Sequence, residues 1–465
     1  MSVKNLELPL SSEVRVSSLQ KPLQTQQLAD WHVSMISVGG IIGAGLFVGT
    51  SATIAAAGPA VILSYLAAGL LVWIVMLLLG KLALHHEGRG SFISHVATVL
   101  GRHSGFVTGW SYAFLWVVTA GAQAVAGGII IGHLLDVPST PGALGLVALG
   151  LLLNMLPVRI YGLSEGILSI FKLIALALFI SAGVFWAMTT PGAEARIHDN
   201  MLGHGGFFPL GVWAIPAVVP MIVQTFTGCE IAFVASVDSE DARRNVRRTV
   251  MRLPFLILLF YLGSVLVILS LRPWTDIIPG QSPFVLVMHD LHIPGTEGLA
   301  IAVTLIAIVS CLNSAKYVVS RVLRELATLG CAPAKLHRST SSGVPLLAVS
   351  ITAFTETLIV LSATWSPSRV YAVLLGSSGT IIIFSYFMAS LACLHISKRQ
   401  AGGRKISLLA GLCSAILALL LAVLPVFAQT RLNAGLAYAL IAFIGLTGLL
   451  FLRRQAVPPT RGLPT

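Results

Sequence analysis

The sequence predicts an all-α integral membrane protein with twelve transmembrane helices. Of the 465 residues, 56% are hydrophobic and only 10% are charged, and the mean hydropathy is +0.90. Soluble proteins carry roughly 25% charged residues, and a helix needs about 20 apolar residues to cross the hydrocarbon core of a bilayer. Twelve apolar stretches meet this requirement, at about 32–56, 59–80, 104–134, 142–157, 160–189, 212–235, 253–271, 298–322, 345–363, 370–395, 406–427 and 433–452.

The distribution of positive charge predicts the orientation. Residues 1–30 are polar and lack the apolar centre of a signal peptide, so this tail is expected to stay in the cytosol. With twelve spans, most of the 29 Lys and Arg residues then fall in cytoplasmic segments, as the positive-inside rule requires. The basic run at 242–252 fits this rule and indicates no nucleic-acid partner. The exceptions are Arg196, Arg272, Arg369 and Arg431 outside, and Lys172 and Lys316 within spans.

A glycine-rich stretch, SVGGIIGAGLFVG at 37–49, interrupts the first span. Glycine costs about 1 kcal/mol relative to alanine inside a helix. Small residues can also serve close helix packing, and Gly45 and Gly49 fit that explanation. The remaining glycines cover more than one helix face, which favours a broken helix that lines a cavity.

The sixth span carries a second interruption. It reads VWAIPAVVPMIVQTFTGCEIAFVAS and contains Pro216, Pro220, Gly228 and Glu230. Transporters built from inverted repeats have broken helices at corresponding positions of their two halves, and the sixth span corresponds to the first. We therefore expect helices 1 and 6 to be broken side by side.

Two adjacent breaks can bind a zwitterion without a charged side chain. Amides that begin a half-helix bind a carboxylate, and carbonyls that end a half-helix bind an ammonium group. The amides near Gly43 and the carbonyls near Val38 and Phe226 are the expected partners. The complete set of predicted substrate-binding residues is Val38, Gly39, Gly40, Ile41, Gly43, Ala44, Gly45, Phe226, Gly228 and Glu230.

The sequence resembles the bacterial amino-acid transporter (amino acid permease) family of the amino acid–polyamine–organocation superfamily. The resemblance covers nearly the whole chain and includes the first two spans, SGFVTGWSYAFLWVV in span three, SPFVLVM before span eight and CLNSAKYVVSRVL within it. It implies a LeuT-like core of five plus five inverted helices with two helices added. The expected organisation is a tail at 1–30, a transport core at 31–400, and two final helices with a tail at 401–465.

The resemblance also implies proton-coupled uptake of an amino acid. Lys172, near the middle of span five, corresponds to the position where sodium-coupled relatives bind a sodium ion, so its ammonium group is expected to replace the metal. A buried lysine can exchange a proton near neutral pH. The proton-coupling neighbours implied are Ser310, Asn313 and Ser314, which share one face of span eight.

Two carboxylates have open assignments. Glu165 lies on roughly the same face as Lys172 and matches an acidic family position, although an interfacial charge at the end of the span explains it equally well. Glu230 follows the second break and is expected to act as a gating or substrate-proximal group. The chain departs from the family at Lys81, Ala242 and Lys316, and snorkelling to the cytoplasmic surface is the simplest explanation of Lys316.

Other function classes fit less well. None of the eight lysines is followed by Ser or Thr, as a phosphate-binding loop requires, and no H-E-x-x-H motif is present. The five cysteines show no C-x-x-C spacing. We therefore expect no enzyme, metal or cofactor, but a proton symporter for a small zwitterion in the bacterial cytoplasmic membrane, with both termini cytoplasmic. An amino-acid or amine exchanger not driven by protons is the alternative.

Overall fold

Every regular element that the computed structural model describes is a helix. The described residues are 38, 40–85, 91–156, 158–231, 242–291, 295–340, 343–399, 403–427 and 430–456. Eight helices within them are long and apolar enough to cross a membrane, and three shorter apolar helices accompany these. The predicted all-α membrane fold is confirmed, whereas the count of twelve spans stays a prediction.

The uninterrupted helices lie where hydropathy predicts them. A helix satisfies its own backbone hydrogen bonds, which hydrocarbon cannot do, so apolar runs of membrane length become helices. They are α4 (Val61–His85), α6 (Arg102–Leu135), α7 (Ser139–Asn154), α8 (Val158–Thr189), α12 (Ala242–Leu271), α14 (Thr296–Thr328), α15 (Leu346–Ser362), α16 (Pro367–Arg399), α17 (Arg404–Val423) and α18 (Arg431–Ala456).

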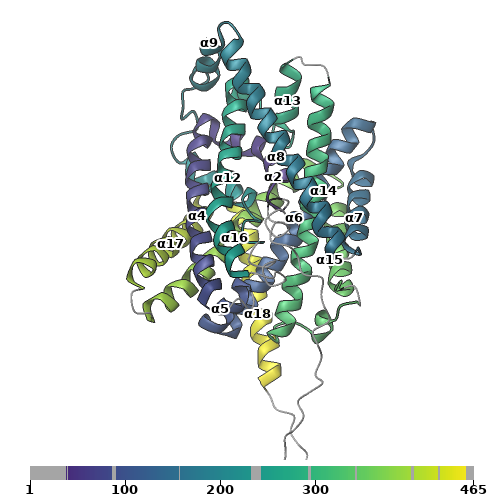
Figure 1. Ribbon diagram of the computed structural model, residues 1–465, viewed down its shortest axis with the longest axis vertical. Helices are drawn as coiled ribbons and strands as arrows, with labels where there is room; N and C mark the ends of the chain where they lie inside the picture. Colours follow the sequence, from purple (N-terminus) through teal and green to yellow (C-terminus); the bar gives the residue numbers. More distant parts are fainter. Residues whose placement is uncertain are drawn as a thin grey trace, which may run out of the picture.

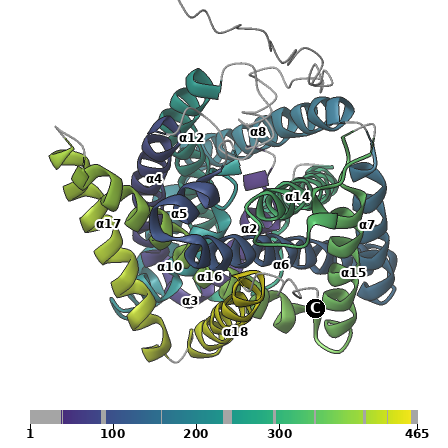
Figure 2. The same ribbon diagram turned by 90° about the horizontal axis from the view of Figure 1, so that it is seen from below.

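The first and sixth predicted spans are interrupted instead. The second half of the first span consists of α2 (Ala44–Phe47) and α3 (Gly49–Ala57), and the sixth contains α10 (Ala214–Thr225) followed by turns. In both views α2 lies near the centre of the molecule, among α6, α8 and α14 (Figures 1 and 2). The prediction that helices 1 and 6 are broken is confirmed.

The last two helices lie outside this centre. In the second view α17 runs along the left edge of the molecule, and α18 lies at its lower edge (Figure 2). Both expose large apolar side chains such as Leu412 and Phe443, which suits contact with lipid. The predicted tail at 1–30 lies outside the described residues, so the domain division stays a prediction.

Three short helices were not predicted, because none is long enough to cross a bilayer. They are α5 (Phe92–Leu100), α9 (Ala193–His198) and α13 (Pro283–Asp290). Ser91 caps α5 by accepting a bond from the Ile93 amide, and the Glu325 carboxylate of α14 accepts bonds from Ser91. At the other end of the molecule, Arg272 after α12 binds Asp290 of α13, and this hydrogen bonding raises the pKa of the guanidinium group.

Candidate functional site

The first break exposes three successive carbonyl groups to side chains from three different elements. The Gly40 carbonyl accepts a bond from Cys311 Sγ of α14 at 3.2 Å. The Ile41 carbonyl accepts one from the Tyr261 hydroxyl of α12 at 3.1 Å, and the Ile42 carbonyl accepts one from Lys172 Nζ of α8 at 3.0 Å. The end of a half-helix thus gathers donors around it, as its partial negative charge requires.

The second break lies directly against the first. Helix α10 ends at Thr225, and Gly228 adopts a φ of +122°, a conformation that glycine tolerates and other residues rarely adopt. A Cβ atom on Gly228 would lie 2.8 Å from the Ile41 amide nitrogen. The Tyr261 hydroxyl joins the breaks by donating both to the Ile41 carbonyl and to the Thr225 carbonyl, the latter at 2.9 Å. Glycine at 228 is therefore required by both conformation and space.

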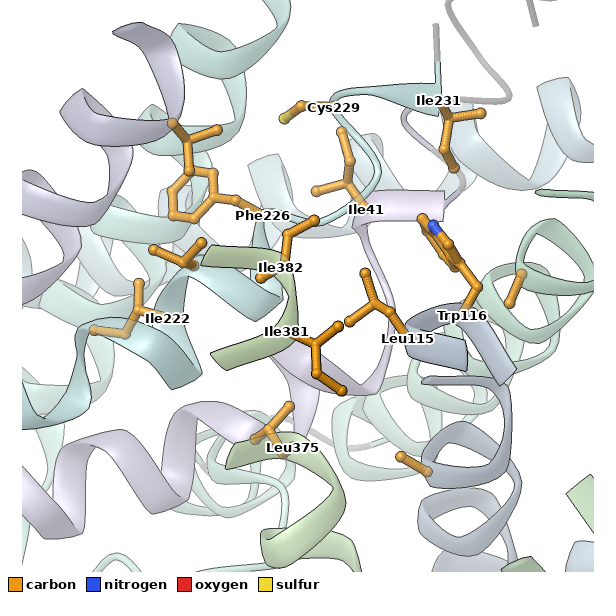
Figure 3. Close-up of a cluster of buried hydrophobic side chains, with 14 of the residues drawn as sticks. Ile41, Leu115, Trp116, Ile222, Phe226, Cys229, Ile231, Leu375, Ile381 and Ile382 are labelled. Atoms are coloured by element: carbon orange, nitrogen blue, oxygen red, sulfur yellow. The ribbon is translucent and has the colours of Figure 1, made fainter. Parts of the chain in front are cut away.

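A shell of buried apolar side chains encloses the two breaks on one side. Figure 3 shows Ile41 and Phe226 from the breaks facing side chains of α6 and α16, among them Trp116 and Ile382. The Phe226 ring also packs on Tyr261, with ring centroids 5.0 Å apart. Apolar surroundings of this kind lower the local dielectric constant, which strengthens polar interactions of the backbone groups inside them.

The start of the second half of the first span, at Gly43 and Ala44, lies against α6 and α14. Ala44 N–H donates to Gln123 Oε1 at 2.8 Å, whereas Gly45 N–H has no partner among the described residues. A Cβ atom on Gly43 would lie 2.6 Å from Cys311 Cβ and 3.0 Å from Gln123 Nε2. Glycine at position 43 therefore lets both helices approach the break.

A small cavity lies between the breaks and the helices that face them. It encloses about 20 Å³, room for about one water molecule. An amino acid can enter only if lining side chains move. The lining consists of Gly40, Ile41, Gly45, Thr119, Ala122, Gln123, Gln224, Thr225, Thr227, Cys311, Tyr371, Leu375 and Ser378. Among the described residues, this lining contains polar groups but no charged side chain.

Lys172 and Glu165 are fully buried and joined by α14. Lys172 Nζ donates to Ser310 Oγ at 2.7 Å, Ser310 Oγ donates to Glu165, and Asn313 Nδ2 donates to Glu165 Oε2 at 3.3 Å. Asn154 of α7 in turn donates to the Asn313 side-chain oxygen at 2.6 Å. Glu165 therefore belongs to a buried network, and the explanation of it as an interfacial charge is wrong.

Glu230 holds the second break in place. Its carboxylate accepts hydrogen bonds from Tyr112 of α6 at 3.0 Å, from Tyr386 of α16 at 2.9 Å and from the Gly228 amide at 3.1 Å. Glu230 does not line the small cavity. The carboxylate is thus bound by tyrosines from two different helices, α6 and α16.

Lys316 is not at the surface. It is fully buried and forms a direct ion pair with Glu356 of α15, which is also fully buried. The proposed snorkelling of Lys316 is therefore wrong. Its stem packs against α7, because a Cβ atom on Gly150 would lie 3.0 Å from Lys316 Cε.

The structure brings most of the predicted site residues together, with some changes of role. The Val38 carbonyl accepts from the Ile42 amide, and the Phe226 carbonyl accepts from the Cys229 amide, so both are already bonded. Ser314 lies on the predicted face, with its Cβ 3.5 Å from an ideal Cβ on Gly40. Gly39 lies outside the described residues.

Sequence reasoning missed the side chains that contact the breaks from other helices. These are Gln123, Gln224, Tyr261, Cys311 and Tyr371, whose hydroxyl donates to the Ala44 carbonyl at 3.0 Å. The two glutamines within apolar spans were the available signal, because a polar amide inside a membrane needs a partner. Glu356 was missed as well, although a carboxylate in an apolar span carries the same signal.

A model of the family described as "Amino acid permease" matches residues 32–452. The chain belongs to this family. The gamma-aminobutyric acid permease of Bacillus subtilis is 33% identical over 385 residues, covering 82% of this chain and 81% of the relative. The gamma-aminobutyric acid permease of Escherichia coli K12 is 34% identical, covering 81% and 82%. The aromatic amino acid transport protein AroP of Escherichia coli K12 is 30% identical, covering 80% and 82%.

Solved transporter structures share the fold of this permease. A Na⁺-coupled sialic acid symporter matches with a TM-score of 0.56 at 14% identity, over 87% of this chain and 91% of that one. A manganese transporter of Eremococcus coleocola matches with a TM-score of 0.54 at 12% identity, over 91% and 93%. The predicted LeuT-like class is confirmed. The relatives' names describe permeases, which points to a transporter and not to an enzyme.

Proposed function

We propose that this permease imports an amino acid or a related small zwitterion across the bacterial cytoplasmic membrane by proton symport. The paired breaks support a main-chain site in which the amides of Ala44 and Gly45 bind the carboxylate. Carbonyls of the same break and its partner bind the ammonium group. The uncharged cavity lining favours substrates without a net side-chain charge. Three curated relatives carry γ-aminobutyrate in their names, so this compound is the first substrate to test.

Lys172 carries the proposal of proton coupling. Its ammonium group binds the Ile42 carbonyl of the broken span and Ser310 of α14 at once. Loss of the proton would leave a neutral amine, whose hydrogen bonds to the Ile42 carbonyl and to Ser310 are weaker than those of an ammonium group. The link between α14 and the broken span would then be weaker. A proton shifts the equilibrium between two conformations only through its different affinity for them. If the broken span moves away from Lys172 in one of the two conformations, the ammonium group loses its bond to the Ile42 carbonyl there, and the lysine binds its proton less tightly.

The orientation belongs to the same proposal. With both termini in the cytosol, the basic run at 242–252 lies on the cytoplasmic side, as the positive-inside rule requires. The Arg272–Asp290 pair then lies on the outer side. Protons and substrate would enter from that side and leave toward the cytosol.

Uptake by proteoliposomes tests the function. With an acid-outside gradient, the wild-type protein should concentrate γ-aminobutyrate or another member of an amino-acid panel. Lys172→Ala should lose gradient-driven accumulation while retaining binding, and Lys172→Arg should behave similarly because arginine does not deprotonate in this range. Accumulation by Lys172→Ala in proportion to the gradient would contradict the assignment. Wild-type counterflow without any response to the gradient would indicate the exchanger instead.

A further inference from the structure

Gln123 contacts the first break, although it was not predicted from the sequence as a site residue. It lies in α6 with only 5% of its surface exposed, and its Oε1 atom accepts a hydrogen bond from Ala44 N–H at 2.8 Å. This amide begins the second half of the first span, which continues through α2 and α3 to Ala57. A buried amide needs an acceptor. Gln123 therefore supplies the oxygen that a carboxylate would supply in the proposed complex.

The other end of the same side chain is not held. Among the described residues, Gln123 Nε2 has no hydrogen-bond partner, although the side chain is buried and lines the small cavity. The second glutamine of the cavity differs. Gln224 Nε2 donates to Thr119 at 2.9 Å, and Gln224 Oε1 accepts from Thr227 at 3.4 Å. Gln123 is thus attached to the site by a single hydrogen bond, while Gln224 is attached at both ends.

The size of the cavity adds a steric reason for movement. About 20 Å³ cannot hold an amino acid, and Gln123 stands between the cavity and the amide of Ala44. A ligand can reach that amide only if the glutamine side chain leaves. Movement costs one hydrogen bond, and the unpaired Nε2 end adds no further bond to break.

We propose that Gln123 is a displaceable internal cap, which occupies the carboxylate position at the first break until the substrate carboxylate replaces it. The inference rests on the proposed binding of a carboxylate at this break. Binding then requires a group that competes with an amide oxygen, and a carboxylate does so because charge-assisted hydrogen bonds are stronger than neutral ones. The cap lowers the apparent affinity for carboxylates in proportion to the fraction of molecules that are capped, whereas amines without a carboxylate do not compete for the Ala44 amide and bind independently of the cap.

Gln123→Met tests the cap, because methionine has a similar length but no amide oxygen. Gln224→Met is the matched control on the same cavity. The probes are γ-aminobutyrate and L-phenylalanine, with propylamine and 2-phenylethylamine as their counterparts without a carboxylate, in titration calorimetry of the full-length protein. Gln123→Met should bind the carboxylate probes about fivefold more tightly, the worth of one ordinary hydrogen bond. It should bind the amines as the wild type does, and Gln224→Met should gain nothing.

Weaker or unchanged binding of the carboxylate probes by Gln123→Met would overturn the cap, as would an equal gain for the amines. A second measurement needs no ligand. Amide hydrogen exchange in the peptide around Ala44 should accelerate in Gln123→Met and not in Gln224→Met, and equal exchange would also overturn the cap. The wild type could bind neither γ-aminobutyrate nor L-phenylalanine while amide exchange around Ala44 is still faster in Gln123→Met. That result would contradict the proposed function but would still show that Gln123 caps the Ala44 amide.

Discussion

Two buried Lys–Glu pairs lie in this permease and differ in what surrounds them. Lys172 and Glu165 both lie on α8 and are linked through Ser310 of α14, and the lysine also binds a carbonyl of the broken first span. Lys316 and Glu356 form a direct pair between α14 and α15. One oxygen of Glu356, Oε1, has no hydrogen-bond partner among the described residues. The first pair is part of a hydrogen-bond network that includes the broken span, whereas the second pair is a direct ion pair between two helices.

The difference bears on the function of each pair. Burial of two opposite charges costs several kcal/mol of desolvation per ion and is compensated only by good geometry and further hydrogen bonds. The pair at Lys172 has these bonds, and one of them ends on the broken helix. The pair at Lys316 connects two helices that are continuous in this structure. We therefore expect the first pair to serve coupling and the second to fix α15 against α14.

Removal of both charges from each pair should separate these roles most strongly. Lys172→Met combined with Glu165→Leu should abolish accumulation driven by a proton gradient, because nothing at this site can then exchange a proton. Lys316→Met combined with Glu356→Leu should accumulate substrate as the wild type does, because apolar residues of similar volume often replace a buried pair without loss. Proteoliposome uptake measures both. Loss of accumulation in the second double variant would show that Lys316 and Glu356 also belong to the coupling machinery.

Removal of one charge from the direct ion pair of Lys316 and Glu356 should destabilise the protein. Lys316→Met leaves Glu356 buried without its partner, and such a change costs about 3–5 kcal/mol. The melting temperature of the purified protein should fall clearly below that of the double variant Lys316→Met with Glu356→Leu. Equal melting temperatures for the single variant and the wild type would mean that Glu356 already lacks a charge.

Removal of the bridging hydroxyl should have a smaller effect. Ser310→Ala leaves Lys172 and Glu165 in place but removes the hydroxyl group that joins them. A hydrogen bond to a charged group changes an equilibrium constant by about a factor of ten or more. Gradient-driven uptake should fall about tenfold. Ser320→Ala is the control on α14, since among the described residues the Ser320 hydroxyl donates to the Tyr317 carbonyl of its own helix and to no other element. An equal loss in both variants would point to damage of α14 and not of the network.

The membrane made much of the fold predictable. Backbone groups must be satisfied inside hydrocarbon, so each apolar run of sufficient length had essentially one structure available. The breaks were predictable for the same reason, because glycines and prolines in those runs have to lie at a protein-lined site. The contact of Lys172 with Ser310 of α14 lies where the family resemblance and the helical spacing predicted it, whereas the coupling role of Lys172, Ser310 and Asn313 stays a prediction.

The partners across helices were not predictable in the same way. A span that is apolar on every face does not reveal how it is rotated, so nothing in the sequence directed Glu356 toward Lys316, which lies 40 residues earlier. Gln123 and Tyr261 also approach the breaks from other helices. Short helices such as α5 were missed because their ends are set by local caps and tertiary contacts, and not by the thickness of the bilayer.

Tyr261 connects the two breaks without holding them rigidly together. A hydroxyl group carries one hydrogen, and here that single proton is shared between the Ile41 and Thr225 carbonyls at 3.1 and 2.9 Å. If one carbonyl withdraws, the other takes the full bond, so separation costs less than one complete hydrogen bond. The same phenol can therefore keep both half-helices aligned at rest and follow either of them during a displacement, adding only a small barrier to their relative motion.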